Sequence, residues 1–208
     1  MRVGVLGPGK MPVDAGKAKE IWFGGYGMIG KKAWEEARQR TLACFRSVGI
    51  ALTKAEEERI EIADFGLGRL AEIGLEILTY VNTERCCAKE LVLFPHQLCP
   101  EHRHPPIAGV SGKEETFRCR HGCVFLYVPG ERGKSIFGHP PADKGDCFTV
   151  WHEIILSPGE QYTLLPNTPH WFQAGPEGAI VSEFSTKSVD EADVFTDPEI
   201  KRLPVVSG

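Results

Sequence analysis

Long apolar runs and a strong charge of either sign are both missing from this sequence. No stretch of about eighteen apolar residues is present, so no membrane-spanning helix is expected, and the first residues lack the apolar core of a signal peptide. The 24 Lys and Arg against 28 Asp and Glu give a formal net charge of −4, which favours neither a nucleic acid nor an anionic membrane as a partner. We therefore expect a cytoplasmic protein.

Paired cysteine spacing is missing as well. The seven cysteines are odd in number, contain no Cys-x-x-Cys spacing and include the adjacent Cys86 and Cys87, which make a poor structural disulfide. A reducing compartment with buried, apolar thiols explains this usage best. The same packing role is favoured over a nucleophilic one for Cys99 and Cys119, the two cysteines nearest to the histidines discussed below.

The length of 208 residues fits one domain with a substantial core. Residues 1–27 are rich in glycine without a clear period, and we interpret them as an N-terminal extension whose membership of the fold is left open. Residues 28–208 are predicted to form a single domain whose first part, about 29–60, is helical.

Two helices are expected in that first part. Residues 31–47 place an apolar stripe at three-and-four spacing, made by Trp34, Ala37, Thr41, Cys44 and Phe45. Thr53 stands three residues before Glu56, which is the pattern of a capping box at the start of a second, short helix. Core packing outside a barrel is favoured for both helices, with contact to a partner subunit as the alternative.

After Phe65 the pattern changes to β-branched and aromatic runs separated by Gly, Pro, Asn and Asp turns. The expected strands are 75–81, 89–94, 116–128, 148–156 and 179–185. Short strands in series, without alternating helices, predict a mainly β fold, an antiparallel barrel or jelly roll. The polar, proline-bearing stretch 129–146 is expected to be an exposed hairpin loop, with a lid over a pocket as an open alternative.

A His-x-His pair marks the predicted functional region. His102 and His104 stand two residues apart in CPEHRHPP, so on an extended strand both imidazoles point to the same side. On the next expected strand Glu115 shares a face with Phe117, whereas Glu114 shares the other face with arginines. Because arginine prefers water and phenylalanine prefers burial, Glu115 is predicted to point inward.

A second block, PGEQYTLLPNTPHWF, delivers His170 after a turn that contains Gly159 and Pro166. Three imidazoles and one carboxylate inside a small barrel would make a mononuclear metal site. Nitrogen and oxygen donors without thiolate suit manganese, ferrous iron, nickel, cobalt or zinc, and four protein ligands leave two positions of an octahedral metal open for a substrate. His139 and His152 belong to no such motif and are expected to be ordinary residues.

The two blocks together resemble the cupin superfamily, in which His-x-His, a glutamate with six residues before a glycine, and a later Gly…Pro…His recur. Here these positions are filled by His102, His104, Glu115, Gly122 and His170. The gap between His104 and Glu115 is longer than in most cupins, so the first hairpin carries an insert. This resemblance implies a cupin-type antiparallel β-barrel with the helices at its N-terminal side.

Longer strings narrow the resemblance. Four segments look like those of the bacterial D-lyxose isomerase family: ELVLFPHQLCPEHRHPP, GKEETFRCRHGCVFLYVPGE, YTLLPNTPHWFQAGPEGAIVSEFST and DVFTDPEI. The similarity extends from about Met28 to the C-terminus. The resemblance implies a manganese-dependent isomerase that interconverts D-lyxose and D-xylulose, and often D-mannose and D-fructose, through a metal-bound enediol. It also implies a homodimer and the metal ligands His102, His104, Glu115 and His170.

Candidates for the proton-shuttling residue follow from strand alternation. Lys113 should face the pocket beside Glu115, where a divalent cation and partial burial would lower the pKa of the lysine. Glu183 stands among apolar residues of an expected strand, which is unusual for a carboxylate without a charged or substrate partner. Both are predicted catalytic residues, ahead of Asp190 and Asp193, and a hydride shift without any base remains an alternative route.

A sugar pocket also needs walls and hydrogen-bonding groups. Phe117, Phe172, Trp171 and Tyr127 are candidates for the walls, with core packing as the alternative role for each. The predicted substrate-binding residues are Lys113, Phe117, Phe172 and Asp193.

Three other functions compete with a sugar isomerase. A ferrous-iron dioxygenase uses the same ligand set, and oxygen consumption would reveal it. A cupin that binds sugar without turnover, or a storage barrel, would have no need for all four metal ligands.

Overall fold

The structure, a computed structural model, describes residues 28–202 and 205–207, and two helices follow its first short strand. Helix α1 (Lys31–Ser47) has the predicted bounds, and α2 (Lys54–Glu58) follows it. The Thr53 hydroxyl accepts from the Glu56 N–H at 3.3 Å while the Glu56 carboxylate accepts from the Thr53 N–H at 2.7 Å, which confirms the capping box. The proposed extension over 1–27 lies outside the described residues.

Helix α1 packs on the outer face of a large sheet, as its apolar stripe predicted. Phe45 is fully buried in a cluster with Leu78, Val92 and Ile180 of the sheet. The buried residues of the helix are Ala37, Thr41, Leu42, Cys44 and Phe45, so Leu42 belongs to the stripe and Trp34 packs only at its margin. Neither described helix is long and apolar enough to cross a membrane.

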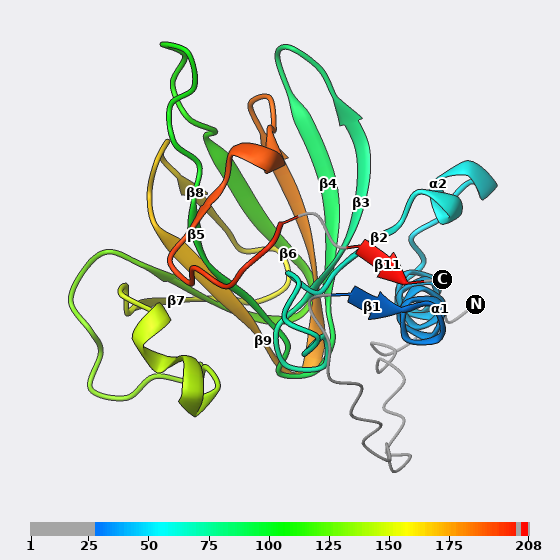
Figure 1. The fold of residues 1–208 in the computed structure, drawn as a ribbon, viewed down its shortest axis with the longest axis horizontal. Coiled ribbons are helices and arrows are strands. Elements are labelled where there is room, and N and C mark those ends of the chain that lie inside the picture. The colour runs from blue at the N-terminus through cyan, green and yellow to red at the C-terminus, as the bar shows by residue number, and fades with distance from the viewer. Residues whose placement is uncertain (1–27, 203–204, 208) are drawn as a thin grey trace, which may run out of the picture.

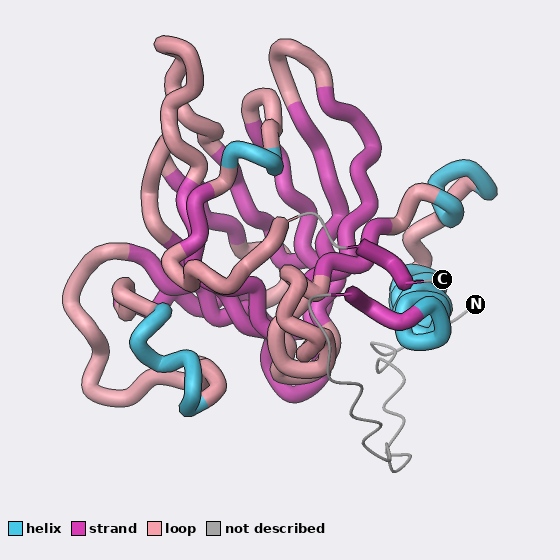
Figure 2. Tube along the Cα trace, viewed as in Figure 1, coloured by secondary structure: helices cyan, strands magenta, loops and turns pink. Residues whose placement is uncertain are grey.

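Strands make up most of the remaining chain (Figures 1 and 2). A small parallel pair, β1 (Met28–Gly30) with β11 (Val205–Ser207), lies beside α1. The other nine strands form one antiparallel sheet: β2 (Glu61–Ala63), β3 (Leu75–Asn82), β4 (Cys87–Leu93), β5 (Leu98–Arg103), β6 (Glu115–Val128), β7 (His152–Leu156), β8 (Gln161–Leu164), β9 (His170–Ser185) and β10 (Val194–Phe195).

Strand β9 is the centre of this sheet and the reason that it curls. Its two halves pair with β5 and β4 on one side, and both halves pair with β6 on the other side. The sheet order β10-β5-β9-β4-β3-β2 therefore bends around an interior that holds one main hydrophobic core. The open, curved sheet with helices outside it agrees with the predicted antiparallel barrel (Figure 1).

Gly122 is the point at which β6 bends against β9. The register between the two strands shifts on either side of it, and its φ is +72°. A Cβ at this position would lie 2.0 Å from the carbonyl oxygen of Gly178, so no other residue fits without moving backbone. Gly122, which the sequence motif separates from Glu115 by six residues, thus serves the curvature of the barrel.

Two strand predictions were clearly wrong in their extent. Strand β7 begins at His152 and not at Phe148, because the preceding backbone is bound by side chains: Glu101 accepts from the Val150 N–H, and the Trp171 indole donates to the Val150 carbonyl. Strand β9 begins at His170 and not at Ala179, and it passes through a Gly-Pro-Glu-Gly stretch that has the composition of a turn. Strands β2, β8 and β10 were not predicted.

The long connection 129–146 runs between the antiparallel strands β6 and β7 and ends in a short helical turn, η1 (Ala142–Cys147). Lys144 forms an ion pair with Asp197 at 2.9 Å, and the His139 N–H donates to the Gln173 side chain at 2.7 Å. No residue of this loop lines the pocket described below. The lid alternative is therefore not what the structure shows.

Candidate metal centre

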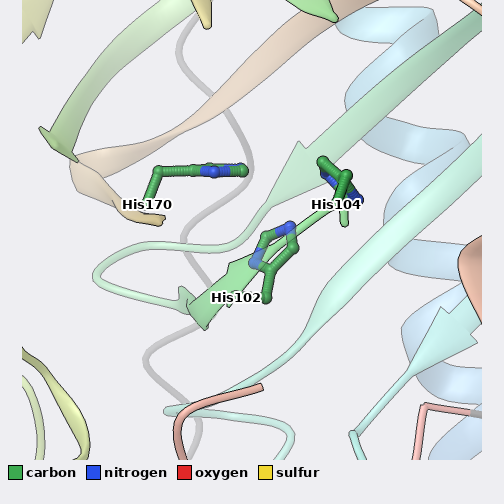
Figure 3. Close-up of side chains that lie close together, drawn as sticks. All are labelled: His102, His104 and His170. Carbon is green, nitrogen blue, oxygen red and sulfur yellow. The ribbon is translucent and has the colours of Figure 1, made fainter. Parts of the chain in front are cut away.

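Three buried histidines lie close together (Figure 3). His102 lies on β5, His104 follows directly after this strand, and His170 begins β9 opposite His102 in the register. Their ring centroids are 4.3 to 5.5 Å apart. One nitrogen of each ring lies within 4.8 Å of the others, so the group can hold a metal ion.

An oxygen acceptor faces the Nδ1 atom of each of these histidines. The Nδ1 of His102 lies 2.9 Å from the Pro100 carbonyl oxygen, and that of His170 lies 3.0 Å from the Thr168 carbonyl oxygen. The Nδ1 of His104 lies 2.5 Å from a carboxylate oxygen of Asp193. A proton on each Nδ1 satisfies these acceptors and leaves each Nε2 lone pair free for a metal.

Glu115 adds an oxygen donor beside two of these histidines. Its Oε1 lies 3.0 Å from the Nε2 of His104 and 3.1 Å from the Nε2 of His170. All three atoms are buried, and none has a hydrogen-bond partner among the described residues. Metal–ligand bonds of about 2.1 Å at right angles place neighbouring donors roughly 3 Å apart, which matches these separations.

Strand alternation and a close backbone approach together place Glu115. As predicted, Glu115 is buried with Phe117 while Glu114 is exposed. The insert between His104 and Glu115 brings the backbone at Gly112 back beside His104. A Cβ added at Gly112 would lie 2.0 Å from the His104 carbonyl oxygen. The absence of a side chain at Gly112 therefore lets the start of β6 pass directly beside the histidine.

A buried lysine joins two carboxylates next to the histidines. The Nζ of Lys113 lies 2.7 Å from Oε2 of Glu115 and donates to Oε1 of Glu183 at 3.0 Å. Burial alone would lower the pKa of Lys113, but the two carboxylates outweigh burial and raise it. The carboxylates on either side stabilise the ammonium, and the lowering expected from a nearby divalent cation stays a prediction for the metal-bound protein.

Burial and neighbouring charge act in opposite directions on the other groups. Burial would raise the pKa of Glu115, yet Lys113, His104 and His170 hold it well below its usual range. Burial, with His170 and His104 nearby, lowers the pKa of His102. For His104, burial is outweighed by Glu115 and Asp193, which raise its pKa to about 9.

The C-terminal segment 186–202 forms the far wall of the pocket. Strand β10 pairs with β5 and brings Asp190, Asp193 and Arg202 to the pocket lining. Asp190 is bound on both sides, by Lys89 at 2.9 Å and by Arg202 at 2.9 Å. Of the lower-ranked candidates, Asp190 thus lies in an ion-pair cluster and Asp193 contacts a histidine.

Two charged residues of the pocket lining, Lys89 and Arg202, were missed in the sequence. Lys89 shares the inward face of β4 with Leu91, and the alternation argument applied to Glu183 would have found it. Arg202 comes from a segment without a strand pattern, so no periodic signal marks it. The predicted residues Lys113, Glu183, Phe117, Phe172 and Asp193 all line the pocket.

Aromatic residues divide between the pocket and the core. Phe117 and Phe172 line the pocket, with ring centroids 5.0 Å apart. Trp171 and Tyr127 stack at 3.8 Å within the core, away from the pocket, so the packing alternative holds for them. Burial raises the pKa of the Cys119 thiol to about 12 and that of Cys99 well above its usual value, which agrees with packing roles.

Curated proteins of similar sequence are sugar isomerases. The chain is 61% identical over 173 residues to D-lyxose ketol-isomerase from Cohnella laeviribosi, covering 83% of this chain and 95% of that protein. It is 58% identical over 179 residues to D-lyxose/D-mannose isomerase from Thermosediminibacter oceani, covering 86% of this chain and 99% of that protein. No protein-family model matches the sequence.

The fold is also that of solved sugar isomerases. The structure of Cellulomonas parahominis L-ribose isomerase with L-ribose superposes with a TM-score of 0.71 at 15% identity, covering 87% of this chain and 99% of the other. This likeness confirms the predicted mainly β, cupin-type fold. The identities of 58 to 61% over most of both chains go further, because they place the sequence among enzymes. The chain belongs to the D-lyxose ketol-isomerase family of sugar isomerases.

Proposed function

We propose that the chain is a metal-dependent aldose–ketose isomerase that interconverts D-lyxose and D-xylulose, and also D-mannose and D-fructose. One observation carries this proposal: the unpartnered donor atoms of His104, His170 and Glu115 lie beside the buried Lys113–Glu183 pair. The names of the relatives, which include D-lyxose and D-mannose, support the substrates.

The metal would be held by Nε2 of His102, His104 and His170 and by Oε1 of Glu115. When bound, a divalent ion polarises the sugar carbonyl and acidifies the neighbouring C–H bond as a Lewis acid. Nitrogen and oxygen donors without thiolate suit Mn²⁺, which we propose as the native ion, and other divalent transition metals also suit this set.

Glu183 is the proposed proton carrier. Its two hydrogen bonds, from Lys113 and from the Ser185 hydroxyl at 3.4 Å, both reach Oε1, which leaves Oε2 for the substrate. The carboxylate takes the proton from C2 of the aldose, and the carbonyl oxygen at C1 gains a proton, which gives the enediol. Glu183 then returns its proton to C1 while the hydroxyl at C2 loses one, and the ketose is formed.

Lys113 supports this transfer as a fixed positive charge. Because its ammonium lies between Glu115 and Glu183, it keeps both carboxylates in place. A third N–H remains to donate to a substrate oxygen that becomes negative during the reaction. We therefore assign the proton transfer to Glu183 and substrate binding to Lys113.

The pocket lining offers a sugar both apolar and charged groups. Phe117 and Phe172 offer an apolar face to the sugar C–H groups, and the charged group of Lys89, Asp190 and Arg202 lies in the same lining for its hydroxyls. Asp193 stays a proposed substrate contact through the oxygen that His104 does not use.

Isomerisation of D-lyxose in D₂O tests the proposed proton route. The proton on the Glu183 carboxyl group can exchange with solvent before it returns to the sugar. Transfer through an enediol therefore predicts that solvent deuterium accumulates at C1 of D-xylulose when the reaction runs to equilibrium over many turnovers, which proton NMR detects. A direct hydride shift would leave C1 free of solvent deuterium and remove the carrier role of Glu183.

The homodimer implied by resemblance is also kept as a proposal. Gel filtration coupled to light scattering should give twice the chain mass of 23.0 kDa. A strict monomer at all protein concentrations would contradict it.

A further inference from the structure

The Nδ1 partner of His104 differs in kind from those of the other two histidines. His102 and His170 face backbone carbonyl oxygens, whereas His104 faces the carboxylate of Asp193. A carboxylate is the stronger acceptor, since a hydrogen bond to an ionised group is roughly twice as strong as one between neutral groups. It also makes the imidazole a better electron donor at Nε2.

Asp193 is held in place by the backbone around it. It stands directly before β10, whose Val194 and Phe195 pair with Arg103 and His102 of β5. The Phe195 ring stacks on the His102 ring with centroids 5.4 Å apart. The side chain of Asp193 is only 9% exposed, so its carboxylate is shielded from water and needs its partner.

Glu101 anchors the other side of β10. Its carbonyl oxygen accepts from the Thr196 N–H at 3.0 Å, and its carboxylate accepts from the Thr196 hydroxyl at 2.6 Å. The same carboxylate accepts from the Thr149 N–H at 2.5 Å. The segment that carries Asp193 is thus fixed to the strand that carries His102, independently of any metal.

We propose that Asp193 is a positioning residue of the metal centre, which fixes the ring of His104 for metal binding and couples the ion to the docked C-terminal segment. This inference rests on the proposed metal dependence. A carboxylate-bound imidazole presents one nitrogen to the ion in one orientation, which removes the cost of orienting it. Because coupling is reciprocal, a bound ion also stabilises the docked segment.

The segment offers a matched control. Asp197 is also a buried aspartate of the 186–202 segment, but its carboxylate contacts Lys144 at 2.9 Å and the Glu199 N–H at 2.9 Å. It lies outside the pocket lining. Loss of its charge therefore perturbs the same segment without touching a metal ligand.

Chelator competition with Mn²⁺ on the stripped full-length protein measures the effect. Asp193→Ala is expected to weaken Mn²⁺ binding by about 10 to 100-fold. Asp193→Asn keeps an oxygen acceptor without the charge, so its Mn²⁺ affinity should lie between those of Asp193→Ala and the wild type. Asp197→Asn should bind Mn²⁺ with the affinity of the wild type. A wild-type affinity in Asp193→Ala, or an equal loss in Asp197→Asn, overturns the positioning role.

Hydrogen exchange supplies a second readout that does not depend on activity. Adding Mn²⁺ should slow amide exchange of residues 190–196 in the wild type, and this protection should be absent in Asp193→Ala. Equal protection in both proteins would overturn the coupling. Failure of the wild type to bind any divalent ion would instead overturn the proposed metal dependence itself, which keeps the two failures distinct.

Discussion

At the residue scale, the proposed chemistry depends on one buried carboxylate. Glu183 is 4% exposed, and the described hydrogen-bond partners of its carboxylate are Lys113 and Ser185. Lys113 in turn contacts the proposed metal ligand Glu115. A single ammonium group therefore joins the proposed proton carrier to the proposed metal ligands.

Glu183→Gln should lower kcat by about 10² to 10⁴-fold, because the amide cannot accept the C2 proton. The change keeps the size of the side chain and one acceptor for Lys113, so metal content and folding should be retained. A coupled ketose assay with metal analysis measures both. Glu114→Gln, at an exposed position directly before β6, is the matched control. Turnover of Glu183→Gln within tenfold of the wild type would remove the carrier role.

Residue-level prediction from the sequence worked where a strand pattern existed. Alternation along residues 113–119 gave the inward direction of Lys113 and Glu115, and both are buried. Strand alternation could not predict the contact of Asp193 with His104, because these residues are 89 positions apart and no periodic pattern links them. The ion pair of Lys113 with Glu183, 70 positions apart, was hidden for the same reason, so the Glu183 carboxylate, which helps to raise the pKa of Lys113, did not enter the prediction.

At the scale of single elements, the bend of β6 at Gly122 shapes the barrel. The carbonyl oxygen of Gly178 fills the space that a side chain would need, and the backbone has a positive φ. Strand lengths were harder to predict than strand existence. The stretch 148–151 looked like a strand, yet its backbone groups are bound by Glu101, Trp151 and Trp171.

Gly122→Ala should destabilise the fold by about 3 kcal/mol or more, because it adds backbone strain to a clash with fixed backbone. Denaturant unfolding followed by circular dichroism measures this change. Gly145→Ala is the control, since an added Cβ there meets nothing within 4 Å, and its effect should stay within about 0.5 kcal/mol. Equal stability of the two variants would show that Gly122 does not set the bend.

At the scale of the whole molecule, a buried acid lies in the contact between the sheet and α1. Glu76 on β3 is fully buried, and Gln97 donates to its Oε1 at 3.1 Å while its Oε2 has no described partner. Burial raises the pKa of Glu76 to about 8, with the Gln97 hydrogen bond and Arg40 opposing the rise. The acid is therefore protonated in the folded protein at neutral pH.

This proton predicts how stability depends on pH. Between about pH 4.5 and 8 the folded state keeps the proton and the unfolded state loses it, so Glu76 makes the free energy of unfolding fall as pH rises. Glu76→Gln removes this contribution. The variant should match the wild type near pH 5 and exceed it in Tm near pH 8, measured by thermal unfolding of both proteins. A Tm difference that does not change with pH would contradict the raised pKa.

The central claim is that the buried histidines and Glu115 hold a metal on which sugar isomerisation depends. The most direct test is ketose formation by metal-stripped protein from D-lyxose, D-mannose, D-xylose and L-ribose, each with and without Mn²⁺. His170→Ala removes a fully buried candidate ligand, and His152→Ala removes an exposed histidine outside the site. We predict conversion of D-lyxose to D-xylulose that requires Mn²⁺, persists in His152→Ala and is lost in His170→Ala. No turnover of any of the four sugars by wild-type protein with one metal bound per chain would contradict the assignment.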